Sequence, residues 1–133
     1  MHHPPQVADR VLVVDDDDDI RAGLIEFLED HGHSAVGAAN GEEAIALLDP
    51  SNVLPCLIIL DLMMPVMDGP TFRDEQRARP ALANIPVIVV SAYRDIETRA
   101  RDLGAAHWLS KPLDLPALLR LVEQKCALAV SPT

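Results

Sequence analysis

Short apolar segments alternate with longer amphipathic segments along this chain. Residues 11–14, 56–60 and 87–90 are continuous apolar runs rich in β-branched side chains. Such runs are typical of strands that are buried on both faces. Residues 34–38 and 107–109 are weaker strand candidates. The pattern therefore predicts short buried strands with longer connections between them.

The connecting segments show the periodicity of amphipathic helices. Apolar residues recur at helical spacing at Ile20, Leu24, Phe27 and Leu28, at Ala44, Ile45, Leu47 and Leu48, and at Leu115, Leu118, Leu119, Val122 and Cys126. Asn40 with Glu43 forms a capping-box pattern, and Asp114 can cap the last helix. Gly32 and Gly104 stand where helices should end.

A strand followed by a helix, repeated five times, predicts an α/β fold with a doubly wound parallel sheet and helices on both faces. The chain of 133 residues has the length of a single domain. We expect this domain to span residues 9–129, with flexible termini at 1–8 and 130–133.

The composition narrows the classes of partner. The formal net charge is −10, which repels phosphate backbones and anionic lipids, so we expect this domain to bind neither nucleic acid nor membrane. The N-terminus lacks the pattern of a signal peptide. Cys56 and Cys126 both stand among apolar residues, and we interpret them as reduced core residues of a cytoplasmic protein without a disulfide or a zinc site.

Polar residues follow the predicted strands at the points where these strands end. Asp15 and Asp16 follow the first strand, Asp61 the third and Ser91 the fourth, and Lys111 stands just after the fifth. In open parallel sheets, ligands bind beyond the carboxyl ends of the strands. We therefore expect three carboxylates, a hydroxyl and an ammonium group to meet at one edge of the sheet.

Crowded carboxylates indicate a hard cation, because charges about 4 Å apart repel by roughly 4 kcal/mol at an effective dielectric constant near 20. Carboxylates, a carbonyl and waters are the ligands of Mg²⁺ at phosphoryl-transfer sites. One of the carboxylates can then act as a nucleophile and form an aspartyl phosphate, with Lys111 and Ser91 on its oxygens.

Four motifs in order resemble the receiver domain of two-component response regulators, over about residues 10–128. These motifs are Val11-Leu-Val-Val-Asp-Asp16, Leu60-Asp-Leu-Met-Met-Pro65 with Asp68-Gly69, Val89-Val-Ser-Ala92 and Trp108-Leu-Ser-Lys-Pro112. The resemblance implies a flavodoxin-like sheet with strand order 2-1-3-4-5.

The resemblance also implies the role of each site residue. Asp61 is the phosphoacceptor, and Lys111 pairs with the phosphoryl group. Mg²⁺ is held by Asp15, Asp16, Asp61 and the backbone carbonyl of Met63. Ser91 and Trp108 form the switch, and Pro112 follows a cis peptide bond. The chain is then a signalling switch and not a classical enzyme. Because the Met63 side chain cannot hold an attacking water strongly, we expect slow dephosphorylation.

The implied partners are a sensor histidine kinase or a histidine phosphotransfer protein, and a downstream protein target or effector domain. Phosphorylation is expected to change the surface over about residues 93–121, which a target or a second copy of the chain can recognise. The implied partners therefore include a second copy of the chain in a phosphorylation-dependent homodimer.

Other interpretations remain for several of these residues. A phosphatase of the haloacid-dehalogenase type would use Asp15 as its nucleophile, but that family needs a further acidic motif after the lysine, and Asp61 would then have no role. An EF-hand starting at Asp15 would have Ile20 where the loop requires Gly. Trp108 can be a core residue that does not switch.

Simpler roles apply to the rest of the acidic run and to two histidines. Residues 17–19 suit the first turn of a helix, where acidic side chains interact favourably with the helix dipole. His31 and His33 flank Gly32, and a helix-terminating turn explains them better than a metal site does.

Overall fold

The computed structural model describes residues 7–49, 53–64 and 66–130. Within this part of the chain, strands and helices alternate strictly. The elements are β1 (Val7–Val14), α1 (Asp18–Asp30), β2 (Ser34–Ala38), α2 (Gly41–Leu47), β3 (Leu54–Asp61), α3 (Gly69–Arg77), β4 (Val87–Ser91), α4 (Ile96–Asp102), β5 (His107–Ser110) and α5 (Leu115–Val130).

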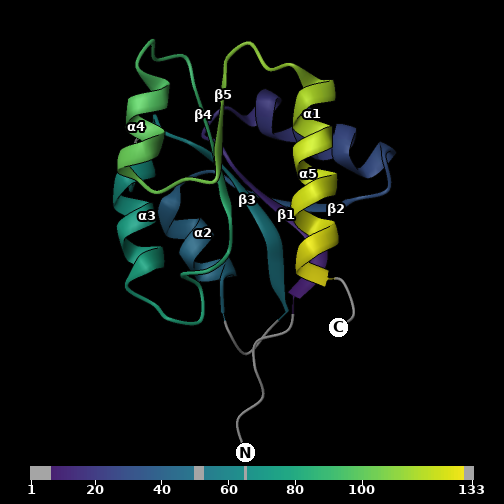
Figure 1. The fold of residues 1–133 in the computed structure, drawn as a ribbon, viewed down its shortest axis with the longest axis horizontal. Helices are drawn as coiled ribbons and strands as arrows, with labels where there is room; N and C mark the ends of the chain where they lie inside the picture. The colour runs from purple at the N-terminus through teal and green to yellow at the C-terminus, as the bar shows by residue number, and fades with distance from the viewer. Residues whose placement is uncertain (1–6, 50–52, 65, 131–133) are drawn as a thin grey trace, which may run out of the picture.

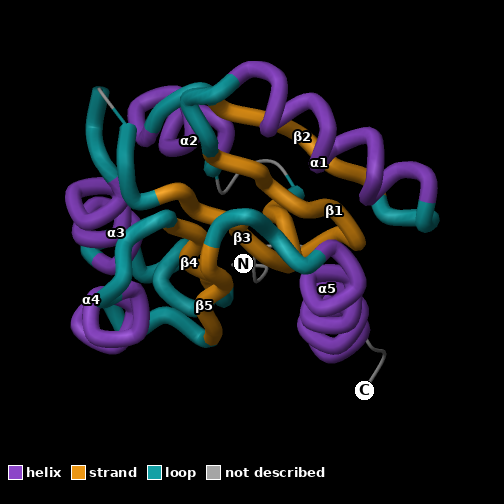
Figure 2. Tube along the Cα trace, turned by 90° about the horizontal axis from the view of Figure 1, so that it is seen from above, coloured by secondary structure: helices purple, strands orange, loops and turns teal. Residues whose placement is uncertain are grey.

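The five strands form a single parallel sheet in the order β2-β1-β3-β4-β5. Figure 1 shows the strands running through the centre of the molecule, and Figure 2 shows the sheet from above, with α1 and α5 on one face and α2, α3 and α4 on the other. The predicted α/β fold and its strand order are therefore confirmed.

Both faces of the sheet carry a hydrophobic core. Leu57 and Ile59 of β3 pack with the apolar stripes of α1 and α5, whereas Ile58 and Leu60 face α2, α3 and α4. This burial on both faces explains why the central strands are continuous apolar runs. None of the helices in the described part of the chain is long and apolar enough to cross a membrane.

The helix ends follow the signals in the sequence. The Asp17 carboxylate accepts hydrogen bonds from the backbone N–H groups of residues 19 and 20 and caps α1. Asn40 caps α2, and Asp114 accepts from Ala117 N at 3.1 Å in the first turn of α5. Gly32 and Gly104 follow α1 and α4 with φ angles of 86° and 66°, which favour glycine.

Two expected boundaries differ from the structure. The sequence predicts a flexible N-terminus that includes Val7 and Ala8, but these residues pair with Leu54 and Pro55 and belong to β1. At the other end, α5 includes Val130. The first difference arises because hydrogen bonding to β3 extends β1 before its apolar run begins, so hydrophobicity alone gives no signal there.

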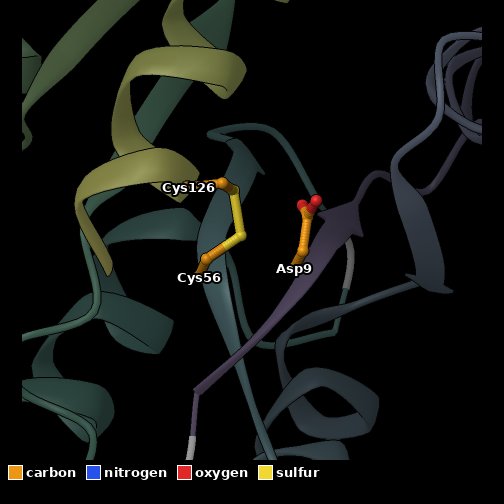
Figure 3. Close-up of side chains that lie close together, drawn as sticks. All are labelled: Asp9, Cys56 and Cys126. Carbon is orange, nitrogen blue, oxygen red and sulfur yellow. A yellow bond between two sulfur atoms is a disulfide. The ribbon is translucent and has the colours of Figure 1, made fainter. Parts of the chain in front are cut away.

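The prediction for the cysteines is wrong. Cys56 at the start of β3 and Cys126 in α5 are joined by a disulfide, and their Cα atoms are 5.1 Å apart (Figure 3). The two residues are 70 positions apart in sequence, and only the packing of α5 against β3 brings them together. The expected cytoplasmic location therefore loses the support that it drew from reduced cysteines.

A buried polar network joins α3 to two loops. The Gln76 amide group is fully buried and donates to the backbone carbonyls of Leu82 and Ile85 at 2.9 and 3.1 Å. Its oxygen accepts from Arg73 Nη1 at 2.7 Å, and Arg73 Nη2 donates to Gly104 O at 3.0 Å. These contacts hold the connections before β4 and β5, the two strands that carry Ser91 and Trp108.

We expect Gln76→Leu to lower the free energy of unfolding by about 2–3 kcal/mol, because it leaves two carbonyls and the Arg73 guanidinium without their buried partner. Urea unfolding measures this change. The matched control is Gln124→Leu on the exposed side of α5, which should cost less than about 0.5 kcal/mol. Equal effects of the two substitutions would show that the network does not stabilise the fold.

Candidate functional site: an acidic cluster at the ends of β1 and β3

Parallel pairing of β1 with β3 brings the acidic residues together. Val14 is opposite Leu60 in the register, so the residues that follow them leave the sheet side by side. Ligand atoms of Asp15, Asp16 and Asp61 all lie within 4.8 Å of one another. Asp15 and Asp61 are buried, whereas Asp16 is exposed. The structure thus assembles the acidic cluster that the sequence predicts.

Lys111 supplies a positive charge to this cluster. Its Nζ lies 3.3 Å from Asp15 Oδ2 and 3.6 Å from Asp61 Oδ2. The backbone N–H of Lys111 donates to Ser91 O at 2.9 Å, which fixes the start of the loop after β5 beside the end of β4. The Lys111–Pro112 peptide bond is cis, as the resemblance implies.

The environment of Asp61 disfavours its ionised form. Burial, together with the negative charges of Asp15 and Asp16, raises the pKa of this carboxyl group from 3.8 to about 6. The backbone N–H of Met63, which donates to Asp61 Oδ1 at 3.1 Å, and the charge of Lys111 both lower the pKa but do not offset the burial. The cluster therefore holds more negative charge than Lys111 compensates.

The loop that follows Asp61 is held close to α2. Gly41 N donates to Met67 O at 3.2 Å, and a Cβ atom on Gly41 would lie 2.6 Å from the same oxygen. A larger residue at position 41 would therefore displace the loop. Met63 lies in this loop, two residues after Asp61, and is 52% exposed.

The acidic run divides as the sequence suggests. Asp15 Oδ1 accepts from Asp17 N at 2.9 Å, which orients the carboxylate of Asp15 in the cluster. Asp17 caps α1, and Asp18 and Asp19 are exposed in its first turn. His31 is the C-cap residue of α1, in agreement with a terminating role, and its Nδ1 lies 2.8 Å from Phe27 O.

The residues proposed for the switch lie on β4 and β5. Ser91 is 1% exposed, and its Oγ accepts from Tyr93 N at 3.0 Å. Trp108 is partly buried against the cluster that includes Ile96 and Ala100 of α4. The arrangement places a hydroxyl at the site edge and an aromatic ring beneath α4.

Sequence reasoning gave Tyr93 no role at the site. Its side chain lines an open pocket beside the acidic cluster, together with Asp16, Leu62, Met63, Met64 and Asp68. The Arg99 guanidinium lies 4.0 Å from the centre of the Tyr93 ring, within the range of a cation–π contact. The only sequence signal for the location of Tyr93 beside the acidic cluster is its position two residues after Ser91.

Comparison with known sequences agrees with this architecture. The model of the response regulator receiver domain family matches residues 11–123. A 14.6 kDa protein of Leptolyngbya boryana is 41% identical over 118 residues, which cover 87% of this chain and 88% of that protein. The transcriptional regulatory protein PdtaR of Mycobacterium tuberculosis is 37% identical over 86% of this chain, but this chain spans only 55% of PdtaR.

Solved structures show the same fold. A response regulator receiver protein from Pseudomonas putida is 36% identical with a TM-score of 0.78, and the match covers 89% of this chain and 98% of that one. The chemotaxis protein CheY4 of Vibrio cholerae is 29% identical with a TM-score of 0.78, over 90% of this chain and 99% of that one.

The raised pKa of Asp61 gives a prediction for the metal-free protein. The pKa of Asp61 in the folded protein is about 6, which lies above the reference value of 3.8. The ionised carboxylate therefore lowers the free energy of unfolding, and this effect is complete above pH 6 and almost absent below pH 4. In the presence of a chelator, Asp61→Asn should therefore raise the melting temperature by a few degrees at pH 7.5, a gain that shrinks towards pH 4.5.

Melting curves followed by circular dichroism between these pH values measure the difference. Asp74→Asn, an exposed acidic residue of α3, is the matched control and should show no such trend. Parallel pH profiles for wild type and Asp61→Asn would contradict the assignment of unfavourable charge to Asp61.

Proposed function

This chain belongs to the response regulator receiver domains, and we propose that transfer of a phosphoryl group to Asp61 switches it. Receiver domains are switches of two-component signal transduction and not classical enzymes. The observation that carries the proposal is the position of Asp61: a buried carboxylate at a strand end, beside two further acidic residues and 3.6 Å from Lys111. We propose that the receiver domain spans the predicted residues 9–129 together with the residues that complete β1 and α5, Val7, Ala8 and Val130.

The acidic cluster fits a magnesium ion. Three carboxylates offer oxygen ligands within 4.8 Å of one another, and their charge exceeds what Lys111 compensates. Oxygen donors of this kind suit Mg²⁺ and not a softer metal. Asp15, Asp16, Asp61 and the backbone carbonyl of Met63 would hold the ion.

Phosphoryl transfer requires a nucleophile, a positive charge for the phosphoryl oxygens and a donor. A carboxylate oxygen of Asp61 attacks phosphorus while the bond between phosphorus and the donor histidine nitrogen breaks. Lys111 then leaves its ion pair with Asp61 to bind a phosphoryl oxygen. Bound Mg²⁺ would supply neutralisation of the charge on phosphorus and its oxygens. The donor is a histidine kinase or a histidine phosphotransfer protein.

The response to phosphorylation begins at Ser91. A phosphoryl group on Asp61 adds nearly two negative charges and strong acceptors, towards which the Ser91 hydroxyl turns from its contact with Tyr93 N. This turn frees space beneath α4, which Trp108 fills by repacking. The surface over residues 93–121 changes as a result and binds a downstream protein target, an effector domain or a second copy of the chain.

Magnesium should stabilise the protein by linkage. At ten times its dissociation constant, Mg²⁺ adds about 1.4 kcal/mol and raises the melting temperature at pH 7.5 by several degrees. Asp16→Asn should remove most of this increase, because it deletes an exposed ligand without disturbing the core. Asp18→Asn, in the first turn of α1, should keep it. If Asp16→Asn responds to Mg²⁺ as the wild type does, the metal site is assigned wrongly.

Labelling with a small phosphodonor such as acetyl phosphate, in the presence of Mg²⁺, tests the nucleophile. We expect intact mass spectrometry to show a single phosphoryl group on the wild type and on Asp74→Asn, and none on Asp61→Asn. A phosphatase of the dehalogenase type would instead lose labelling with Asp15→Asn and retain it with Asp61→Asn. Gel filtration of the labelled protein detects a phosphorylation-dependent dimer.

A further inference from the structure

A second group of metal-ligating side chains lies at the opposite end of β3 from Asp61. Ligand atoms of Asp9 in β1, Cys56 in β3 and Cys126 in α5 all lie within 4.8 Å of one another. Figure 3 shows the Asp9 carboxylate beside the disulfide that joins the two cysteines. Two sulfur atoms and a carboxylate from three different elements thus converge at one point.

A β-bulge explains why Asp9 reaches the cysteines. From the Ala8–Pro55 pair to the Val11–Leu57 pair, β1 contains an extra residue, so Asp9 and Arg10 together face Cys56. Bulges of this kind redirect side chains and often border functional sites. Here the bulge also places the carbonyl oxygen of Arg10 at 3.3 Å from Cys56 Sγ, where it can accept a hydrogen bond from a thiol.

The environment of the three groups suits a metal ion that enters from solvent. Cys56 and Cys126 are 1% and 2% exposed, which shields them from competing ligands. The side chain of Asp9 is 48% exposed and gives access to them. The Asp9 carboxylate is also held in place, because His33 Nδ1 lies 3.1 Å from its Oδ1. Such an outer partner is a common feature of metal sites.

We propose that, once the disulfide is reduced, Asp9, Cys56 and Cys126 bind a zinc ion. Thiolate sulfur with carboxylate oxygen is a typical donor set for Zn²⁺, and a water can complete the four-coordinate site. Rotation of the side chains would have to bring the two sulfurs to about 3.7 Å apart, as two ligands of a tetrahedral Zn²⁺ with bonds of about 2.3 Å require.

The two states of the cysteine pair exclude each other. In the disulfide, neither sulfur carries the negative charge that makes a strong ligand. A dithiol reductant supplies two electrons and two protons, breaks the sulfur–sulfur bond and is itself oxidised to a disulfide. Zn²⁺ then displaces the two thiol protons to solvent and binds the thiolates. Either state ties α5 to β3, by a covalent bond in one case and by the metal in the other.

Cobalt is the spectroscopic probe for this site. The full chain is reduced with a phosphine, stripped of metal and titrated with Co²⁺ in excess Mg²⁺, which keeps the acidic cluster occupied. We expect one Co²⁺ per chain, an intense near-ultraviolet charge-transfer band from thiolate to cobalt, and displacement of Co²⁺ by Zn²⁺. The oxidised protein should show no such band.

Single substitutions identify the ligands. Asp9→Asn should weaken Co²⁺ binding about 10- to 100-fold, and His33→Ala about 10-fold through the position of Asp9. Cys126→Ser should weaken both the charge-transfer band and the affinity. The matched controls are Asp30→Asn and His31→Ala at the end of α1, which should bind as the wild type does.

Several results would overturn the proposal. The proposal is wrong if the reduced protein is folded and has two titratable thiols but shows no charge-transfer band with Co²⁺. It is also wrong if Asp9→Asn leaves the affinity for Co²⁺ unchanged. If reduction unfolds the chain, recovery of the circular dichroism spectrum on adding Zn²⁺ supports the proposal, and failure to recover it shows a disulfide with a purely structural role.

Discussion

The charge crowded at the carboxyl ends of β1 and β3 is the constraint on which the site depends. Parallel pairing places Asp15 and Asp61 side by side in a buried position, and Lys111 provides the positive charge within ion-pair distance of both. Because burial and the neighbouring acids raise the pKa of Asp61 to about 6, the metal-free site stores unfavourable electrostatic energy. A cation or a proton relieves that energy, which couples the cluster to its ligands.

The surrounding structure keeps these charges in position and connects them to the surface. Asp17 orients Asp15 through its backbone N–H, and Met63 does the same for Asp61. The buried contact between Arg73 and Gln76 anchors the loops that precede β4 and β5. Asp61 therefore lies between backbone segments that are fixed by hydrogen bonds and the partly buried residues that pack against α4.

The chain carries chemistry at both ends of β3. Asp61 is the last residue of β3 and belongs to a group with hard oxygen ligands. Cys56, near the start of β3, belongs to a group with soft sulfur ligands. The two sites differ in their donor atoms: carboxylate oxygens suit Mg²⁺, whereas thiolate sulfurs suit Zn²⁺. α5 connects them, because its N-terminus follows the loop of Lys111 and its C-terminal half carries Cys126.

The sequence by itself determined the alternation of strands and helices, the caps at Asn40 and Asp114, and the convergence of Asp15, Asp61 and Lys111. These features depend on local periodicity and on one rule of parallel sheets, so the order of residues is sufficient to find them. Only the tertiary structure decided the pairing of Cys56 with Cys126 and the buried role of Gln76. Their partners are distant in sequence or are backbone carbonyls, for which no residue type gives a signal.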